Sequence, residues 1–246
     1  MYPVLFRIGD VEVTSFGVLV AAGALLGLWL FRRELRFSRL PGSAVDAGVA
    51  GLIGGLAGAK LLWIAEHVGD EPLADLVFSR GGLSWFGGLA GGLLAGAWII
   101  YRQRLPLVPV LSAAAPALAA SHIVGRIGCF LVGDDYGTPS DLPWAVAFPE
   151  GLPPTNVPVH PTQLYEAAAL LPVVWLLLRM RRRDVADHVV LGTYLALTGA
   201  LRFGIEFIRV NEHVLGPLSV AHVASVAVSA AGLALLIRER IRLLRL

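Results

Sequence analysis

The stretch LPLVPVLSAAAPALAASHIVG, residues 105–125, decides the fold because it contains no Asp, Glu, Lys or Arg. It is long enough to cross the hydrocarbon core of a bilayer as a helix, which takes about 20 residues. The segment RIGCFLVGDDY, residues 126–136, follows directly and brings one arginine and two adjacent aspartates. Ionisable groups at membrane depth are costly and usually face a polar cavity or a partner. The two segments therefore predict a transmembrane helix that ends at a polar site, with a solvated helix end and a Gly/Asp turn as the alternative.

The composition of the chain is that of a membrane protein. Hydrophobic residues make up 56% and charged residues 15%, whereas soluble domains have about 25% charged residues. The 28 glycines fit helices that pack closely in lipid. The single cysteine, Cys129, excludes an internal disulfide or a cysteine-cluster metal site, and we expect neither a metal nor another cofactor.

The apolar segments predict an all-α integral membrane protein with seven transmembrane helices and one polytopic membrane domain over residues 1–246. No break in composition suggests a second domain. The first span follows charged residues and no typical cleavage site comes after it, so we interpret it as a retained helix rather than a signal peptide. The predicted spans are 13–31, 45–65, 81–101, 105–126, 162–179, 189–209 and 214–237.

Clusters of arginine predict the orientation. They follow the first, third, fifth and seventh spans, and by the positive-inside rule that side is cytoplasmic. The N-terminus is then outside and the C-terminus cytoplasmic. Because these arginines adjoin span ends, we expect the lipid bilayer and no nucleic acid as their partner. The clusters are Arg32, Arg33, Arg36 and Arg39; Arg102 and Arg104; Arg179, Arg181, Arg182 and Arg183; and Arg238, Arg240, Arg242 and Arg245.

Other basic residues point to an anion site near the outer side. Arg202, Glu206 and Arg209 have the spacing i, i+4, i+7, which places them on one face of a helix. With Arg126 and Lys60 added, the predicted site has more positive charge than Glu206 balances. Arginine offers a planar fork that suits phosphate oxygens, so an anionic phospholipid head group is the expected ligand. The alternative is an Arg–Glu–Arg network that neutralises itself and joins two helices.

Several longer motifs resemble those of the prolipoprotein diacylglyceryl transferase family, in the same order and over nearly the whole chain. They are GGLSWFGGL (81–89), GRIGCFLVGDDYG (125–137), DLPWAVAFP (141–149), HPTQLYE (160–166), RFGIEFIR (202–209) and Leu-Ser at 218–219.

The resemblance implies a multi-pass enzyme of the bacterial inner membrane. It would transfer the diacylglyceryl group of phosphatidylglycerol to a cysteine thiol of a prolipoprotein on the outer side, releasing glycerol phosphate and forming a thioether. Its expected partners are phosphatidylglycerol or another anionic phospholipid, and prolipoprotein signal peptides.

This chemistry needs a base for the thiol and cations for the departing phosphate. We expect five residues to be catalytic, with Arg126 and Arg202 stabilising the phosphate and His122 or Asp134 as the base. His160 is a further candidate for the base, with Glu166 near it in sequence. The catalytic set is Arg126, Arg202, His122, Asp134 and Glu206, and the substrate-binding set is Lys60, Gly137, Asp135, His160, Gln163, Tyr165 and Arg209.

The chain also departs from the family's motifs. Phe86 stands where the family has a histidine, Cys129 and Val132 stand at asparagine positions, and Asp134 stands at a glutamate position. Phe16 and Thr198 stand at tyrosine positions. These differences leave open another acceptor, or a phospholipid-binding protein without catalysis. A transporter is less favoured, because the ionisable groups lie only toward the outer ends of the spans.

Overall fold

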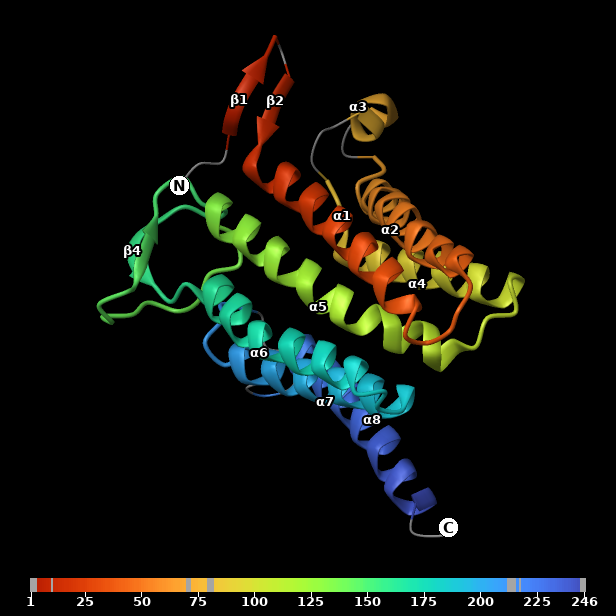
Figure 1. Cartoon of the computed structure of the whole chain (residues 1–246). Helices are drawn as coiled ribbons and strands as arrows, with labels where there is room; N and C mark the ends of the chain where they lie inside the picture. Colours follow the sequence, from red (N-terminus) through yellow and green to blue (C-terminus); the bar gives the residue numbers. More distant parts are fainter. Residues whose placement is uncertain are drawn as a thin grey trace. The chain divides into compact units, whose positions relative to one another are not determined.

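The computed structural model describes residues 4–9, 11–69, 72–78, 82–211, 216 and 218–243. It is mostly helical (Figure 1). The long helices are α1 (Ser15–Leu35), α2 (Val45–Glu66), α4 (Trp85–Arg102), α5 (Leu107–Val132), α6 (Thr162–Arg182), α7 (Asp187–Glu206) and α8 (Val220–Leu243). Two short helices, η1 (Gly42–Ala44) and α3 (Leu73–Phe78), lie in the connections.

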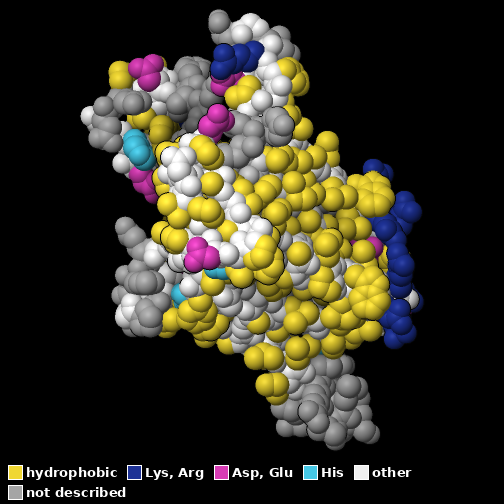
Figure 2. All heavy atoms as spheres, turned by 90° about the vertical axis from the view of Figure 1, so that its left-hand side faces the viewer, with side chains coloured by type: hydrophobic (Ala, Val, Ile, Leu, Met, Phe, Trp, Pro, Cys, Tyr) yellow, Lys and Arg dark blue, Asp and Glu magenta, His cyan; other side chains and the backbone are white. Residues whose placement is uncertain are grey.

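Each predicted span overlaps one of these long helices, with ends that differ by a few residues. Residues 81, 214, 215 and 217 of the predicted spans lie outside the described residues. Among the described residues, six helices are long and apolar enough to cross a membrane, namely α1, the η1–α2 segment, α5, α6, α7 and α8. The glycine-rich α4 is not among the six. Large apolar side chains such as Leu25 and Trp175 are 70% and 61% exposed, and hydrophobic side chains dominate the face in Figure 2. Such exposure fits helices whose outer surface contacts lipid.

The prediction of an all-α fold is incomplete, because two antiparallel hairpins occur between or before the helices. One pairs β1 (Val4–Ile8) with β2 (Val11–Thr14), and the other pairs β3 (Val146–Phe148) with β4 (Thr155–Val159). The first hairpin is rich in the β-branched and apolar residues that favour strands. The strands of both hairpins are too short to cross a bilayer. Both hairpins therefore belong to the loops.

The chain separates into two compact units, and the first comprises Met1–Leu30 and Leu111–Leu246. Its buried core joins three helices through Ala115 of α5, Val173 and Leu177 of α6, and Val190 of α7. α6, α7 and α8 lie side by side in Figure 1, in agreement with the packing of α7 on both neighbours. This bundle carries the polar residues described below.

Within the same unit, α1 packs on α5 at a position where α1 has a glycine. The Oγ of Ser121 donates a hydrogen bond to the carbonyl oxygen of Gly23, at 2.8 Å. A Cβ at Gly23 would lie 3.3 Å from the Ser121 carbonyl oxygen. The missing side chain therefore allows close contact of the two helices, as is common between membrane helices.

The second unit, Phe31–Val110, is built around the pair α2 and α4. Glycines of one helix face glycines of the other. A Cβ at Gly58 would lie 2.9 Å from the Cα of Gly91, and a Cβ at Gly54 would lie 2.7 Å from the Gly91 carbonyl oxygen. The glycines of α4 thus allow the backbones to touch.

Candidate functional site

A buried carboxylate on α6 joins two arginines from different helices. Glu166 is 4% exposed. One of its oxygens is ion-paired with the Nε of Arg126, near the end of α5. The other lies 2.8 Å from a guanidinium nitrogen of Arg202 on α7. Glu166 therefore connects α5, α6 and α7 within the first unit.

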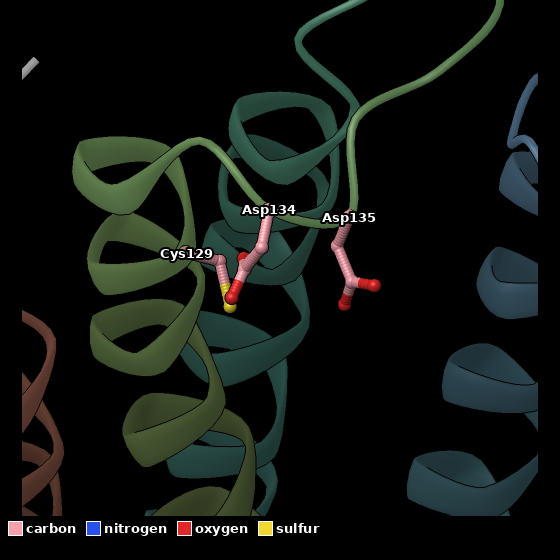
Figure 3. A group of neighbouring side chains, drawn as sticks. All are labelled: Cys129, Asp134 and Asp135. Atoms are coloured by element: carbon pink, nitrogen blue, oxygen red, sulfur yellow. The ribbon is translucent and has the colours of Figure 1, made fainter. Parts of the chain in front are cut away.

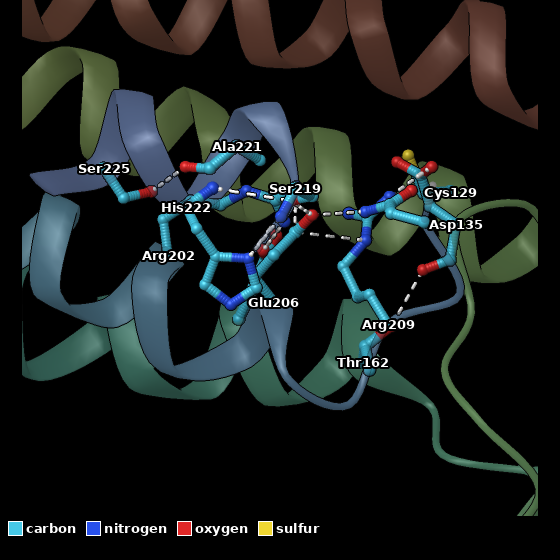
Figure 4. A network of polar contacts seen from close by, with 12 residues as sticks. Cys129, Asp135, Thr162, Arg202, Glu206, Arg209, Ser219, Ala221, His222 and Ser225 are labelled. Atoms are coloured by element: carbon cyan, nitrogen blue, oxygen red, sulfur yellow. Dashed lines mark hydrogen bonds and ion pairs between the residues drawn. The ribbon is translucent and has the colours of Figure 1, made fainter. Parts of the chain in front are cut away.

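A second buried carboxylate, Glu206, extends this network to the start of α8 (Figure 4). One of its oxygens lies 2.7 Å from Arg202 and 4.0 Å from the Nε of Arg209. The other accepts hydrogen bonds from Asn211 Nδ2 at 2.6 Å and from the Ser219 hydroxyl at 2.5 Å. Arg202 thus bridges two carboxylates with the two ends of its fork.

Asp135 completes the network from the loop that follows α5. Its two oxygens lie 2.8 Å from Arg126 and 2.5 Å from Arg209. The residue has φ +60°, a conformation that Asp tolerates better than most residues, and its carbonyl oxygen accepts a hydrogen bond from Thr162. The side chain is 45% exposed. Of the three carboxylates, Asp135 is the one open to solvent.

The neighbouring Asp134 points toward Cys129 (Figure 3), and its electrostatic environment is opposite to that of Asp135. Partial burial raises the pKa of Asp134 above its ordinary value, against the hydrogen bond with Cys129, and the Asp135 charge raises it further. For Asp135, burial is outweighed by the charges of Arg209 and Arg126, which lower its pKa. Asp134 therefore has the higher proton affinity of the two carboxylates.

The Cys129 thiol and the carboxylates of Asp134 and Asp135 lie within 4.8 Å of one another. Sulfur and carboxylate oxygens are possible metal ligands. Here Asp135 is already paired with Arg126 and Arg209, and both guanidinium charges oppose a cation at this place. With two guanidiniums beside it, this group of side chains suits an ion-pair network better than a metal centre.

The expected excess of positive charge is not what the first unit shows. The three guanidiniums of Arg126, Arg202 and Arg209 are matched by three carboxylates. The expectation was wrong because it counted Glu206 alone, whereas Glu166 and Asp135 reach the same arginines from another helix and a loop. Lys60 belongs to the second unit, where its ammonium lies 4.6 Å from the Trp63 ring centroid.

Comparison with known proteins identifies the family. Residues 3–238 match the model of the family described as prolipoprotein diacylglyceryl transferase. A phosphatidylglycerol–prolipoprotein diacylglyceryl transferase of Geobacter sulfurreducens is 32% identical over 88% of this chain and 85% of its own length. Those of Nitratidesulfovibrio vulgaris and Vibrio vulnificus are each 32% identical, over 97% and 95% of this chain and 94% and 90% of their own lengths. The chain belongs to the prolipoprotein diacylglyceryl transferase family. It is a multi-pass membrane protein.

The structure brings most of the predicted site residues of this diacylglyceryl transferase family member together. His122 lies one turn before Arg126, with its Nε2 3.7 Å from Glu166 and 48% of its side chain exposed. Gln163 donates a hydrogen bond to the Asp134 carbonyl oxygen. The amide of Gly137 donates to the His160 carbonyl oxygen at 2.9 Å.

His160 and Tyr165 form a separate polar group beside this network. The Tyr165 hydroxyl accepts a hydrogen bond from Trp144 Nε1 at 2.7 Å and lies 3.2 Å from His160 Nδ1. Phe86, at the family's histidine position, belongs to the second unit and is 61% exposed. The first unit therefore holds two of the candidate bases, His122 and Asp134, next to the arginines.

Sequence reasoning left four residues of the network out of the predicted site. They are Glu166, Asn211, Ser219 and Thr162. Glu166 had a visible signal, since it is a carboxylate within a predicted span and ends the HPTQLYE motif. Ser219 had a weaker one in the Leu-Ser motif. Nothing in the sequence distinguished Asn211 from other loop residues.

Proposed function

We propose that this protein transfers the diacylglyceryl group of phosphatidylglycerol to the thiol of a prolipoprotein cysteine, at the outer side of the bacterial inner membrane. Three guanidiniums gathered at one end of a helix bundle, in a chain of this family, carry the proposal. In this reaction the thiol sulfur bonds to the glyceryl carbon, and the bond from that carbon to the phosphate oxygen breaks. The products are a thioether and glycerol phosphate, and the thiol proton passes to a base.

The arginine network is proposed to receive the phosphate. Asp135 is exposed and holds Arg126 and Arg209. A lipid phosphate that takes the place of its carboxylate would accept the same guanidinium hydrogen bonds. Glu166 and Glu206 are buried and remain to orient Arg126 and Arg202. Donors fixed in this way cost no reorganisation when charge develops on the leaving phosphate.

His122 and Asp134 are the proposed alternatives for the base. His122 is accessible, with 48% of its side chain exposed and its Nε2 3.7 Å from Glu166. Asp134 has a raised pKa, lies in the same loop as Asp135 and points toward Cys129. His160 is a weaker candidate, because its Nδ1 faces the Tyr165 hydroxyl. Gly137, Gln163 and Tyr165 are proposed to shape the binding loop, and Lys60, in the second unit, stays a predicted substrate-binding residue.

The proposed topology has seven membrane spans, with α4 as one of them, an outer N-terminus and a cytoplasmic C-terminus. Its support is the arginine in the last turns of α1, α4 and α6. A cysteine introduced into the loop before α6 should react with a membrane-impermeant thiol reagent in a Cys129→Ser background. A cysteine placed after α6 should not.

The activity is tested with protein reconstituted in vesicles of phosphatidylglycerol, together with a lipoprotein signal peptide that contains its cysteine. Release of glycerol phosphate and a mass increase of the peptide are expected, and vesicles of phosphatidylcholine should give neither. Expression should also rescue a strain depleted of its own transferase. No release and no rescue would contradict the proposal, and lipid binding without release would identify a non-catalytic phospholipid-binding protein.

A further inference from the structure

The start of α8 has an unusual reciprocal pair of hydrogen bonds. Ser219 precedes the first helical residue, Val220. Its backbone N–H donates to His222 Nδ1 at 3.1 Å, and the backbone N–H of His222 donates to the Ser219 hydroxyl oxygen at 3.4 Å. This is the arrangement of a capping box, with histidine in the position that Glu or Gln usually takes. It fixes both the backbone and the side chain of Ser219.

The fixed hydroxyl of Ser219 points at the arginine network (Figure 4). It donates to one oxygen of Glu206, the oxygen that also accepts from Asn211. The other Glu206 oxygen is the one that faces Arg202 and Arg209. Neutral donors thus hold one side of the carboxylate, and this sets the direction in which the other side meets the guanidiniums.

His222 is held in a single orientation by its surroundings. It is 2% exposed, and its ring lies edge-on to Phe203 and Phe207 at centroid distances of 5.1 and 4.5 Å. Since Nδ1 accepts the Ser219 N–H, the ring hydrogen lies on Nε2. A side chain so buried is placed to act through Ser219 rather than by contact with a substrate head group.

We propose that Ser219 and His222 are positioning residues for the transfer reaction. They orient Glu206, and through it the guanidiniums of Arg202 and Arg209 that receive the leaving phosphate. The inference rests on the proposed function. Ser219 and His222 set the direction of the guanidinium donors and leave the number of cations unchanged. Their replacement should therefore lower kcat and leave the affinity for lipid nearly the same.

The decisive variant is Ser219→Gly. Glycine replaces serine at an N-cap with only a small loss of helix stability, but it has no hydroxyl for Glu206. We expect kcat to fall roughly tenfold, as for loss of one hydrogen bond to a charged group, with KM for phosphatidylglycerol within about twofold of wild type. Ser219→Thr keeps the hydroxyl and should recover most of the rate.

Ser225→Ala is the matched control. Ser225 is a buried serine on the same helix, and its hydroxyl donates to the Ala221 carbonyl oxygen at 2.6 Å rather than to Glu206. It should keep the wild-type kcat. A wild-type protein that releases no glycerol phosphate would refute the proposed function. An active wild type whose kcat survives Ser219→Gly would refute the positioning role alone.

His222 is tested by a second pair of variants. His222→Gln retains an acceptor for the Ser219 N–H, as in the usual capping box, whereas His222→Leu fills the space without one. The leucine variant should lose kcat by a factor close to that of Ser219→Gly, and the glutamine variant should stay within about threefold of wild type. Rates are compared at a temperature where melting curves show every variant folded. Equal rates for leucine and glutamine would assign His222 to packing only.

Discussion

Replacing Arg202 with lysine tests whether a guanidinium must bridge two helices. Arg202 reaches Glu166 on α6 at 2.8 Å with one nitrogen and Glu206 at 2.7 Å with another. A lysine ammonium keeps the charge but lacks the fork, so it should hold only one of the two carboxylates. Each carboxylate still has a second arginine, Arg126 or Arg209, so neither is left buried without a counter-charge.

The free-energy cost expected for Arg202→Lys is that of the one carboxylate contact that lysine cannot make. A hydrogen bond to a charged group contributes about 1.5–3 kcal/mol, and the Arg202 side chain is 27% exposed. We therefore expect a loss of about 1.5–2 kcal/mol, at the lower end of that range. In turnover of phosphatidylglycerol this corresponds to a fall of roughly 10- to 30-fold. The melting temperature in detergent should fall by roughly 3–8 °C.

Arg179→Lys is the matched control, since Arg179 is exposed in the last turn of α6 and lies 5.4 Å from the Trp175 ring centroid. Lysine can keep that cation–π contact. Glycerol phosphate release and thermal melting are measured for both variants in the same preparation. If Arg202→Lys changes neither quantity more than Arg179→Lys does, bridging by the guanidinium has no part in the site.

Three further predictions concern the base, the loop charge and the loop backbone. His122→Ala or Asp134→Asn should lower turnover on the order of 10²-fold, as for loss of a general base, and higher pH should partly restore the rate by ionising the thiol. The pKa of Asp135 is lowered from its ordinary value of 3.8 in the folded protein. Its ion pairs therefore stabilise the fold at any pH above 3.8, and this stabilisation is lost as the pH falls through the lowered pKa. Asp135→Asn should therefore lower the melting temperature near pH 7 and flatten its decline in acid. Gly137→Ala should cost about 1–3 kcal/mol, because a Cβ would lie 2.8 Å from Thr162 Cγ2 and displace the loop.

Each of these predictions has a result that contradicts it. Wild-type turnover of both His122→Ala and Asp134→Asn across pH 6–9 would exclude them as the base, and a gain from Phe86→His would then assign the limitation to that position. For Asp135→Asn, a melting temperature that declines in acid as steeply as wild type would remove the ion pairs from the stability argument. Gly125→Ala, where a Cβ meets open space, is the control for Gly137→Ala and should leave the melting temperature nearly unchanged.

The helices were predictable because their signal is local. A charge-free stretch such as residues 105–125 specifies a membrane helix without reference to the rest of the chain. The helix ends were less certain, since α5 continues through Cys129 to Val132 and Arg209 lies beyond the end of α7 at Glu206. The strands Val146–Phe148 and Thr155–Val159 were not predicted, because they are short and their pairing depends on a turn with no strong sequence signal.

The site was only partly predictable, because its charge balance depends on contacts between distant residues. The spacing of Arg202, Glu206 and Arg209 indicated a cationic cluster within one helix. That Glu166 would face Arg126 and Arg202 depends on how α5, α6 and α7 pack together. Likewise, the role of Ser219 depends on where α8 begins relative to Glu206. Helical periodicity does not specify distances across helices.

The contact of α1 with α5 has a consequence for the order in which the protein is assembled. Ser121, which donates to the Gly23 carbonyl oxygen, is made 98 residues after its partner. At a synthesis rate of about 5–20 residues per second, the first helix waits roughly 5–20 s for the surface it will pack against. In that interval the residues of Phe31–Val110 emerge as a contiguous unit with its own glycine-lined helix pair. The whole second unit is therefore synthesised before Ser121 becomes available to the glycine of α1, so that this contact between α1 and α5 forms late.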